Sequence, residues 1–345
     1  MALHRRFIRR IIVAAALSLG LGSTAQAADE IVLKFADTHP LTHFLSINGH
    51  QAFMKRVQEL TGGKVKFQHF PAEQLGKEKD MLELARKGLA DIVFTGAGQS
   101  SGKLPLGGGA DLPGLGADVV KNTRAYQVYL NSNTLVVDEF LKMGLRPFMG
   151  FMYPPYQVLS GSKPVQKIAD LKGMKIRINS PVMGSAIEAL GGTPVMLTSP
   201  EVFEGLQRGT VDGTTFSYIS GKSWKLEEVV KYGTVGIDVG TVASFWAINE
   251  NTWKKLPDDV KQAIRKASDE TSAAMAAAAD KEEKGIIADW EKKGKGLYHL
   301  TAADQTEWGN KVKPAIEQWI TTMEARGLPA RKSVEQLWKI RAELN

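Results

Sequence analysis

The feature that most constrains the fold is an alternation of strand-like and helix-like segments in the first third of the chain. Residues 30–37, 64–70 and 91–95 are rich in β-branched and apolar residues. Apolar residues recur at helical spacing in 44–60 and 77–88, and glycines follow both segments. Strands that alternate with helices form a parallel sheet covered by helices, so this pattern predicts an α/β fold.

The same alternation returns in the second half of the chain. Residues 145–162 contain strand-like runs broken by Pro154-Pro155, which we interpret as a crossing between two domains. A strand at 174–178, a helix at 181–190 and a strand over 211–220 follow. The sequence therefore predicts two α/β units. The glycine-rich residues 96–116 read as a loop at a cleft, and 118–143 read as one helix.

Residues 256–294 carry one alanine-rich helical pattern of more than thirty residues. This is longer than a typical globular helix. The alanine run does not supply the apolar heptads of a coiled coil. We therefore expect a single helix that lies across both domains.

The N-terminus has the features of a secretory signal peptide. A basic segment with four arginines precedes about a dozen apolar residues, and Ala25-Gln26-Ala27 is an A-x-A cleavage site. We predict a signal peptide over 1–27, cleaved after Ala27, and a periplasmic protein; Sec and twin-arginine export both remain open. Removing these four arginines lowers the formal net charge from +7 to +3. Without a Lys/Arg block, this charge does not predict nucleic-acid binding.

Arg177 is the strongest candidate for a binding residue. It lies in the predicted strand 174–178, and Ser180-Pro181 has the pattern of a helix start. The carboxyl ends of strands and the N-termini of helices are where α/β proteins bind anions. A guanidinium there would add bidentate hydrogen bonding to an anion. The pattern does not distinguish a carboxylate from a phosphate. The alternative is an exposed arginine that contacts only water.

Other residues suggest ligand contacts rather than chemistry. His39 and His43 have metal-pair spacing, but Pro40 opposes a regular helix and no acidic third ligand is near, so we predict no metal. Thr38 and His39 instead fit a ligand-contacting loop after the first strand. The chain has no cysteine, no complete P-loop and no G-x-S-x-G motif, so we predict no catalytic residue and no cofactor.

Four stretches together resemble the periplasmic substrate-binding proteins of tripartite ATP-independent (TRAP) transporters, the dicarboxylate-binding-protein-like family. They are residues 59–92, 170–195, 201–213 and 249–264. The resemblance implies two lobes joined by crossing strands, a long helix spanning both, and a cleft that closes on an organic acid. It also implies a monomer that delivers its ligand to small and large membrane subunits without catalysis.

The resemblance also implies lobe boundaries. Lobe I is expected over 28–153 with about 241–282, and lobe II over 154–240 with about 283–335. The family's K-I-R motif falls on Arg177, whose counterpart pairs with the ligand carboxylate. The expected ligand-binding residues are Arg177, Asn179, Phe216, Gln157, Thr38, His39, Thr95, Thr215, Tyr156 and Trp246.

Two positions depart from sialic-acid-type members of the family. Phe216 replaces an asparagine that assists the arginine, and Gln157 replaces a second arginine. Both changes reduce polarity, so we expect a monocarboxylate with an apolar or aromatic body. The alternatives are an exported α/β enzyme acting on an organic acid, and a binding protein that presents its ligand to a sensor.

Overall fold

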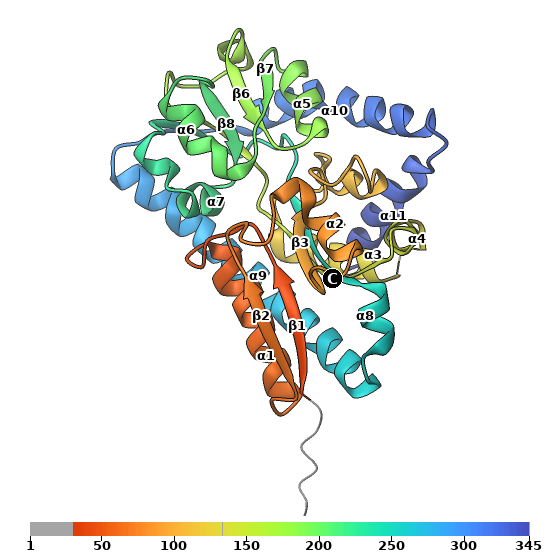
Figure 1. Ribbon diagram of the computed structural model, residues 1–345. Helices are drawn as coiled ribbons and strands as arrows, with labels where there is room; N and C mark the ends of the chain where they lie inside the picture. Colours follow the sequence, from red (N-terminus) through yellow and green to blue (C-terminus); the bar gives the residue numbers. More distant parts are fainter. Residues whose placement is uncertain (1–29, 133, 345) are drawn as a thin grey trace, which may run out of the picture.

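The computed structural model describes residues 30–132 and 134–344 and has two lobes, each built on its own sheet (Figure 1). The predicted signal peptide lies outside the described residues. Lobe I contains a five-stranded sheet in which β1 is parallel to β2 and β3, whereas β10 is antiparallel to β3 and β4. Its order is β2 (Val65–Phe70), β1 (Ile31–Ala36), β3 (Ile92–Gly96), β10 (Ala243–Asn249) and β4 (Leu145–Met152).

Helices cover the sheet of lobe I and carry the loops that face lobe II. They are α1 (Ala52–Leu60) after the π-helical turn η1 (Ser46–Gln51), α2 (Met81–Arg86) after the 3-10 turn η2 (Glu78–Asp80), the 3-10 segment η3 (Leu106–Asp111), α3 (Val119–Ser132), α4 (Thr134–Lys142) and α8 (Glu250–Lys255). The helix predicted over 118–143 corresponds to α3 and α4, which lie on either side of residue 133, a position outside the described residues.

Lobe II contains a six-stranded mixed sheet. Its order is β11 (Gly296–His299), β9 (Tyr232–Val235), β5 (Gln157–Ser160), β8 (Gly213–Phe216), β6 (Lys175–Ile178) and β7 (Thr193–Met196). The remaining elements of this lobe are η4 (Ile168–Leu171), α5 (Pro181–Ala189), η5 (Ser199–Glu201), α6 (Val202–Gln207), α7 (Tyr218–Ser223) and η6 (Leu226–Glu228). Strand β6 is parallel to β7 and β8, and it leads directly into α5, so its carboxyl end and the N-terminus of α5 lie at the same end of the sheet.

Two long helical paths connect the lobes. Helix α9 (Asp258–Lys292) has 35 residues and packs on α1, α3 and β4 of lobe I and on α7 and β11 of lobe II. Helix α10 (Ala302–Glu324) packs on α5, and α11 (Ala330–Glu343) returns to α3. In Figure 1, α9 runs behind β1 and β2 of lobe I and extends to α7 of lobe II. The prediction of one long helix across two α/β lobes is confirmed.

The crossing segments between the sheets pair with each other. The backbone N–H of Tyr153 donates to the carbonyl of Val242 at 3.0 Å, and that of Tyr156 donates to Gly240 at 2.9 Å. The Thr241 hydroxyl donates to the carbonyl of Tyr153 at 2.6 Å. The segments after β4 and before β10 therefore form a short ribbon that connects the two lobes.

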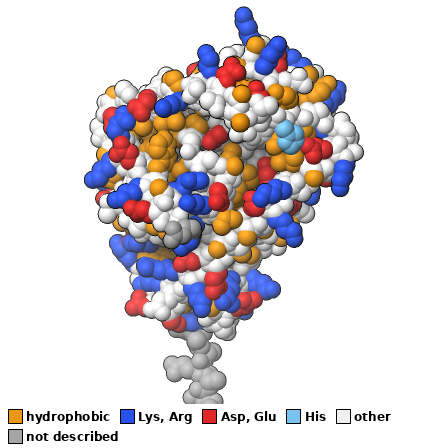
Figure 2. Space-filling model, turned by 180° about the vertical axis from the view of Figure 1, so that it is seen from behind, with side chains coloured by type: hydrophobic (Ala, Val, Ile, Leu, Met, Phe, Trp, Pro, Cys, Tyr) orange, Lys and Arg blue, Asp and Glu red, His pale blue; other side chains and the backbone are white. Residues whose placement is uncertain are grey.

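Surface charge is mixed on the face opposite the view of Figure 1. Figure 2 shows basic and acidic side chains interspersed there. In the residues that the structure describes, no helix combines the length and apolarity needed to cross a membrane.

Candidate ligand-binding site

Arg177 is buried completely between the strands of lobe II. Its Nε donates to the carbonyl of Leu197 at 2.9 Å, Nη1 to the carbonyl of Thr215 at 3.4 Å, and Nη2 to Oγ of Ser199 at 3.3 Å. Lys175, two residues earlier in β6, is exposed. The alternative of an exposed arginine that contacts only water is therefore excluded.

Aromatic rings support the guanidinium from one side. The Phe216 ring centroid lies 4.7 Å from the guanidinium carbon, and the Tyr156 ring stacks on Phe216 at 5.6 Å. Burial lowers the pKa of Arg177 to about 10, although Tyr156 and Glu78 act in the opposite direction. Within the described chain, no carboxylate forms an ion pair with Arg177. A buried charge without an ion pair is costly, so this arrangement suits a site that receives an anion.

The helix start next to Arg177 is formed as the sequence predicts. Ser180 has an extended backbone, and its side chain accepts a hydrogen bond from the backbone N–H of Met183 at 3.4 Å. Pro181 is the first residue of α5. Asn179 connects the end of β6 to this cap, and its side-chain oxygen has no hydrogen-bond partner in the described structure. The helix dipole therefore reinforces the positive potential of Arg177.

A small cavity of about 20 Å³ lies between the two lobes beside this site. Both lobes and the crossing segments contribute to its lining. The lining residues are His39, Glu78, Phe94, Gly96, Gln99, Tyr153, Tyr156, Asn179, Ser199, Ser220, Trp224, Val242 and Ser244. Arg177 does not line the cavity itself, but its Nη2 reaches the lining residue Ser199. Aromatic rings and hydroxyl or amide groups together form the walls.

The structure places the ten expected binding residues in two groups. His39, Tyr156 and Asn179 line the cavity, and Arg177 reaches it through Ser199. Thr38, Thr95, Thr215, Phe216, Gln157 and Trp246 are buried outside the lining. Thr215 supports β6, because its hydroxyl donates to the carbonyl of Arg177 at 3.1 Å.

Gln157 and Trp246 have structural partners instead of facing the cavity. The Gln157 amide nitrogen donates to the carbonyls of Pro155 and Ile237, so this side chain joins two crossing segments. The Trp246 indole nitrogen donates to Nδ1 of His50 at 3.0 Å. The sequence pattern indicates where a strand ends, but it does not indicate which partner each side chain contacts.

Sequence reasoning missed Glu78 and Trp224 as cavity residues. Glu78 lies in the first turn of a helical segment, where acidic residues are common without any ligand. Trp224 follows α7 and gives no periodic signal. The glycine-rich loop was interpreted as a cleft loop, and Gln99 from this loop does line the cavity.

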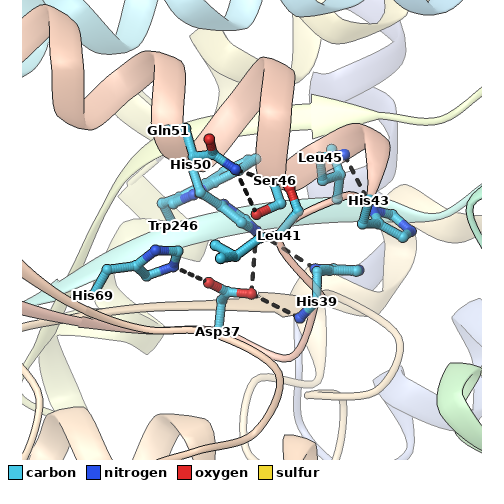
Figure 3. A network of polar contacts seen from close by, with 10 residues as sticks. All are labelled: Asp37, His39, Leu41, His43, Leu45, Ser46, His50, Gln51, His69 and Trp246. Carbon is cyan, nitrogen blue, oxygen red and sulfur yellow. Dashed lines mark hydrogen bonds and ion pairs between the residues drawn. The ribbon is translucent and has the colours of Figure 1, made fainter.

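A network of histidines, of which His39 and His50 are buried and His69 is partly exposed, surrounds Asp37 at the lobe I end of the cavity (Figure 3). Oδ1 of Asp37 accepts from the backbone N–H of His39 at 2.7 Å and lies 3.6 Å from Nε2 of His50, while Oδ2 pairs with Nε2 of His69 at 2.5 Å. Burial lowers the pKa of His39 to about 3 and that of His50 to about 4. These two histidines are therefore neutral at ordinary pH. His50 and His69 each contact one carboxylate oxygen of Asp37.

Asp37, His39 and His50 have the donor atoms of a metal site, all within 4.8 Å of one another. An acidic group therefore does lie near His39, contrary to the sequence reading. However, Trp246 donates to Nδ1 of His50, so the proton of neutral His50 is on Nε2. That nitrogen faces Asp37 and His39 and has no lone pair to offer a metal. The geometry therefore favours a hydrogen-bonded network, and the absence of a metal stays a prediction.

The chain has two lobes, each built on its own sheet, and a ribbon that connects them. Arg177 lies buried beside the cavity between the lobes. These features define a two-lobed solute-binding protein. The chain belongs to the bacterial extracellular solute-binding protein family 7, whose profile matches residues 35–322. The TRAP-family resemblance is thereby confirmed.

Individual relatives agree with this assignment along most of the chain. The C4-dicarboxylate-binding periplasmic protein DctP of Rhodobacter capsulatus is 26% identical over 342 residues, covering 96% of this chain and 98% of the relative. A TRAP solute-binding protein from a marine metagenome, specific for aromatic acids and crystallised with 3-hydroxybenzoate, superposes with a TM-score of 0.84 at 25% identity; 91% and 98% of the chains are covered. A protein of Rhodoferax ferrireducens T118 with copurified benzoate has the same fold, with a TM-score of 0.83, 23% identity and the same coverage.

Proposed function

We propose that this protein captures a monocarboxylate with an aromatic or apolar body and delivers it to the membrane subunits of a TRAP transporter. The observation that carries the proposal is a completely buried arginine without an ion pair beside a cavity with aromatic walls. The carboxylate would occupy the end of the cavity formed by Asn179 and Ser199, next to Arg177.

The cationic end of the cavity has the chemistry of a carboxylate site. Arg177 offers a planar fork of donors, and the N-terminus of α5 adds positive potential. Phe216 and Tyr156 exclude water from one side of the guanidinium. In such surroundings a charge-assisted hydrogen bond is stronger than in water.

The body of the ligand would lie against rings. Phe94, Tyr153, Tyr156 and Trp224 line the cavity, and His39 presents a neutral imidazole. Burial of apolar ligand surface contributes roughly 25 cal/mol per Å² before the costs of association. The similarity to the metagenomic protein that binds 3-hydroxybenzoate supports the same class of ligand.

A C4-dicarboxylate is the competing ligand class, because the relative from Rhodobacter capsulatus is named for it. A second carboxylate would need a second cationic partner or several donors. No lysine or arginine is among the described residues that line the cavity. Lys79 lies in a neighbouring groove at the surface. The cavity therefore favours a single carboxylate.

The cellular role follows from the family. We propose a periplasmic, monomeric binding protein whose signal peptide is removed after Ala27, which works with the small and large membrane subunits and has no enzymatic activity. Assaying candidate acids for turnover as well as for binding would distinguish it from an exported enzyme. Transport by reconstituted membrane subunits would distinguish delivery from presentation to a sensor.

The ligand class is tested by a thermal-shift screen followed by calorimetry. Benzoate, 3-hydroxybenzoate, branched-chain monocarboxylates, succinate, malate and sialic acid are compared at equal concentration. A ligand that binds only the folded protein raises its melting temperature by mass action. We expect the aromatic acids to give the largest shifts and the lowest dissociation constants. Tighter binding of succinate, malate or sialic acid than of every apolar monocarboxylate would reject the proposed class.

A further inference from the structure

Glu78 is a buried acid in the cavity that the proposed carboxylate site does not explain. It begins η2 in lobe I and lines the cavity together with Gln99, Asn179 and Ser199. Its side chain is 9% exposed, and its Oε2 has no hydrogen-bond partner among the described residues. A carboxyl oxygen in this position is available to a ligand.

The charges that face Glu78 come from several elements. Arg177 of lobe II attracts it, whereas Glu73 and Glu201 repel it. Glu73 already pairs with Lys77 at 2.7 Å and accepts from the backbone N–H of Glu78 at 2.9 Å.

Two further groups near Glu78 do not offset its charge. Lys79 lies beside it in the outer groove and forms no ion pair with it in the described structure. His39, at the other end of the cavity, is neutral because burial lowers its pKa to about 3. Arg177 is therefore the main group that stabilises a negative charge on Glu78.

We propose that Glu78 is a ligand-binding residue that takes up a proton when a carboxylate occupies Arg177, and that its free oxygen then donates a hydrogen bond to the bound carboxylate. The proposal rests on the proposed function. A ligand carboxylate would neutralise Arg177 and place a second anion beside Glu78. Both effects oppose a charged Glu78. With one proton added, the guanidinium, the ligand and Glu78 carry no net charge together, and the proton comes from the buffer.

The pH dependence has a defined sign. Burial, and secondarily Glu73, raise the pKa of Glu78 from 4.5 to about 7, while Arg177 and a hydrogen bond with Gln99 act in the opposite direction. Ligand binding raises this pKa further, so the bound protein holds more protons than the free protein. Affinity should therefore fall by up to about tenfold per pH unit above about pH 7, until the pH exceeds the pKa of the bound state.

The other titratable groups near the cavity do not explain a fall in affinity above about pH 7. Burial raises the pKa of Tyr153 well above 10, and hydrogen bonds from Thr198 keep that of Glu201 low. Burial raises the pKa values of Asp111 and Glu283 to about 7, but neither residue lines the cavity. A variant of Glu78 is therefore needed to identify the titrating group.

The test is calorimetric titration with benzoate in phosphate and in Tris, whose heats of ionisation differ. For the wild type, we expect an uptake of about half a proton at pH 7, rising toward one at pH 8. Glu78→Gln, which resembles the neutral acid, should bind without proton uptake and with an affinity that does not change between about pH 6.5 and 8.5. Glu83→Gln, a surface substitution on α2, is the matched control and should behave like the wild type.

Three results would overturn the role of Glu78. They are the absence of proton uptake by the wild type, unchanged uptake by Glu78→Gln, and equal weakening of this variant at every pH. Tighter binding of succinate than of benzoate would reject the proposed ligand class instead. The same two titrations with succinate would then decide the role of Glu78.

Discussion

At the scale of single residues, the site depends on side chains that hold one another in place. Arg177 is fixed by two backbone carbonyls and the Ser199 hydroxyl, and Phe216 and Tyr156 form a stack beneath it. Phe216 was expected to contact the ligand, but it lies outside the cavity lining. The Phe216 ring therefore affects ligand binding through Arg177, because the ring covers one side of the guanidinium.

Phe216→Leu should weaken the binding of every carboxylate without changing the order of preference among them. Leucine keeps apolar volume but loses the ring below the guanidinium, an interaction of about 0.5–2 kcal/mol. This corresponds to about 2- to 30-fold in the dissociation constant measured by calorimetry. Phe245→Leu, a buried change in lobe I, is the matched control and should lower stability without lowering affinity. Unchanged affinity in Phe216→Leu would show that the ring does not support Arg177.

At the scale of elements, the loop after β3 touches the start of α5 across the cleft. Gly98 is in lobe I, and Ser180 caps α5 in lobe II. A Cβ at Gly98 would lie 2.3 Å from Cβ of Ser180 and 2.2 Å from Oδ2 of Asp111. Contacts this short are not compatible with packed atoms. The contact with Ser180 arises where the two lobes approach each other, whereas the contact with Asp111 lies within lobe I.

Gly98→Ala should hinder closure, because its Cβ would clash with Ser180 of lobe II. We expect a larger radius of gyration by small-angle scattering at saturating ligand, and an affinity at least about tenfold lower, since closure completes the cavity. Gly102→Ala is the control in the same loop, because a Cβ there would meet no atom within 4 Å. Circular dichroism establishes that both variants are folded. If Gly98→Ala closes and binds like the wild type, the contact between Gly98 and Ser180 does not limit closure.

At the scale of the whole molecule, the lobes and their connections follow from the sequence more directly than the site does. Periodicity indicates strands and helices because each element repeats its own pattern, and the 35-residue α9 was predicted from one uninterrupted helical pattern. Arg177 was predicted because a strand end, a helix cap and a basic residue coincide within a few positions. These are local signals.

The remaining cavity residues come from both lobes and from segments far apart in the chain. Glu78, Gln99 and Trp224 meet only when the crossing ribbon brings the lobes together. Local patterns carry no information about such contacts. For the same reason, the Asp37 network could not be predicted, since Trp246 reaches His50 from a strand almost two hundred residues away.

The central claim is that Arg177 holds the carboxylate of the ligand. Isothermal titration of Arg177→Ala with the ligand that binds the wild type most tightly tests it directly. We predict a loss of about 2–5 kcal/mol, because a desolvated carboxylate would be left without its partner. This is on the order of 30- to several-thousand-fold in the dissociation constant. Arg177→Lys should recover only part of the affinity, because an ammonium lacks the planar fork.

Two controls separate binding from folding in this measurement. Arg177→Met keeps an apolar side chain over Phe216, and circular dichroism shows whether each variant is folded. Arg208→Ala removes an exposed arginine of lobe II and should bind like the wild type. A folded Arg177→Ala protein that binds within about threefold of the wild type, a difference of less than 1 kcal/mol, would contradict the account.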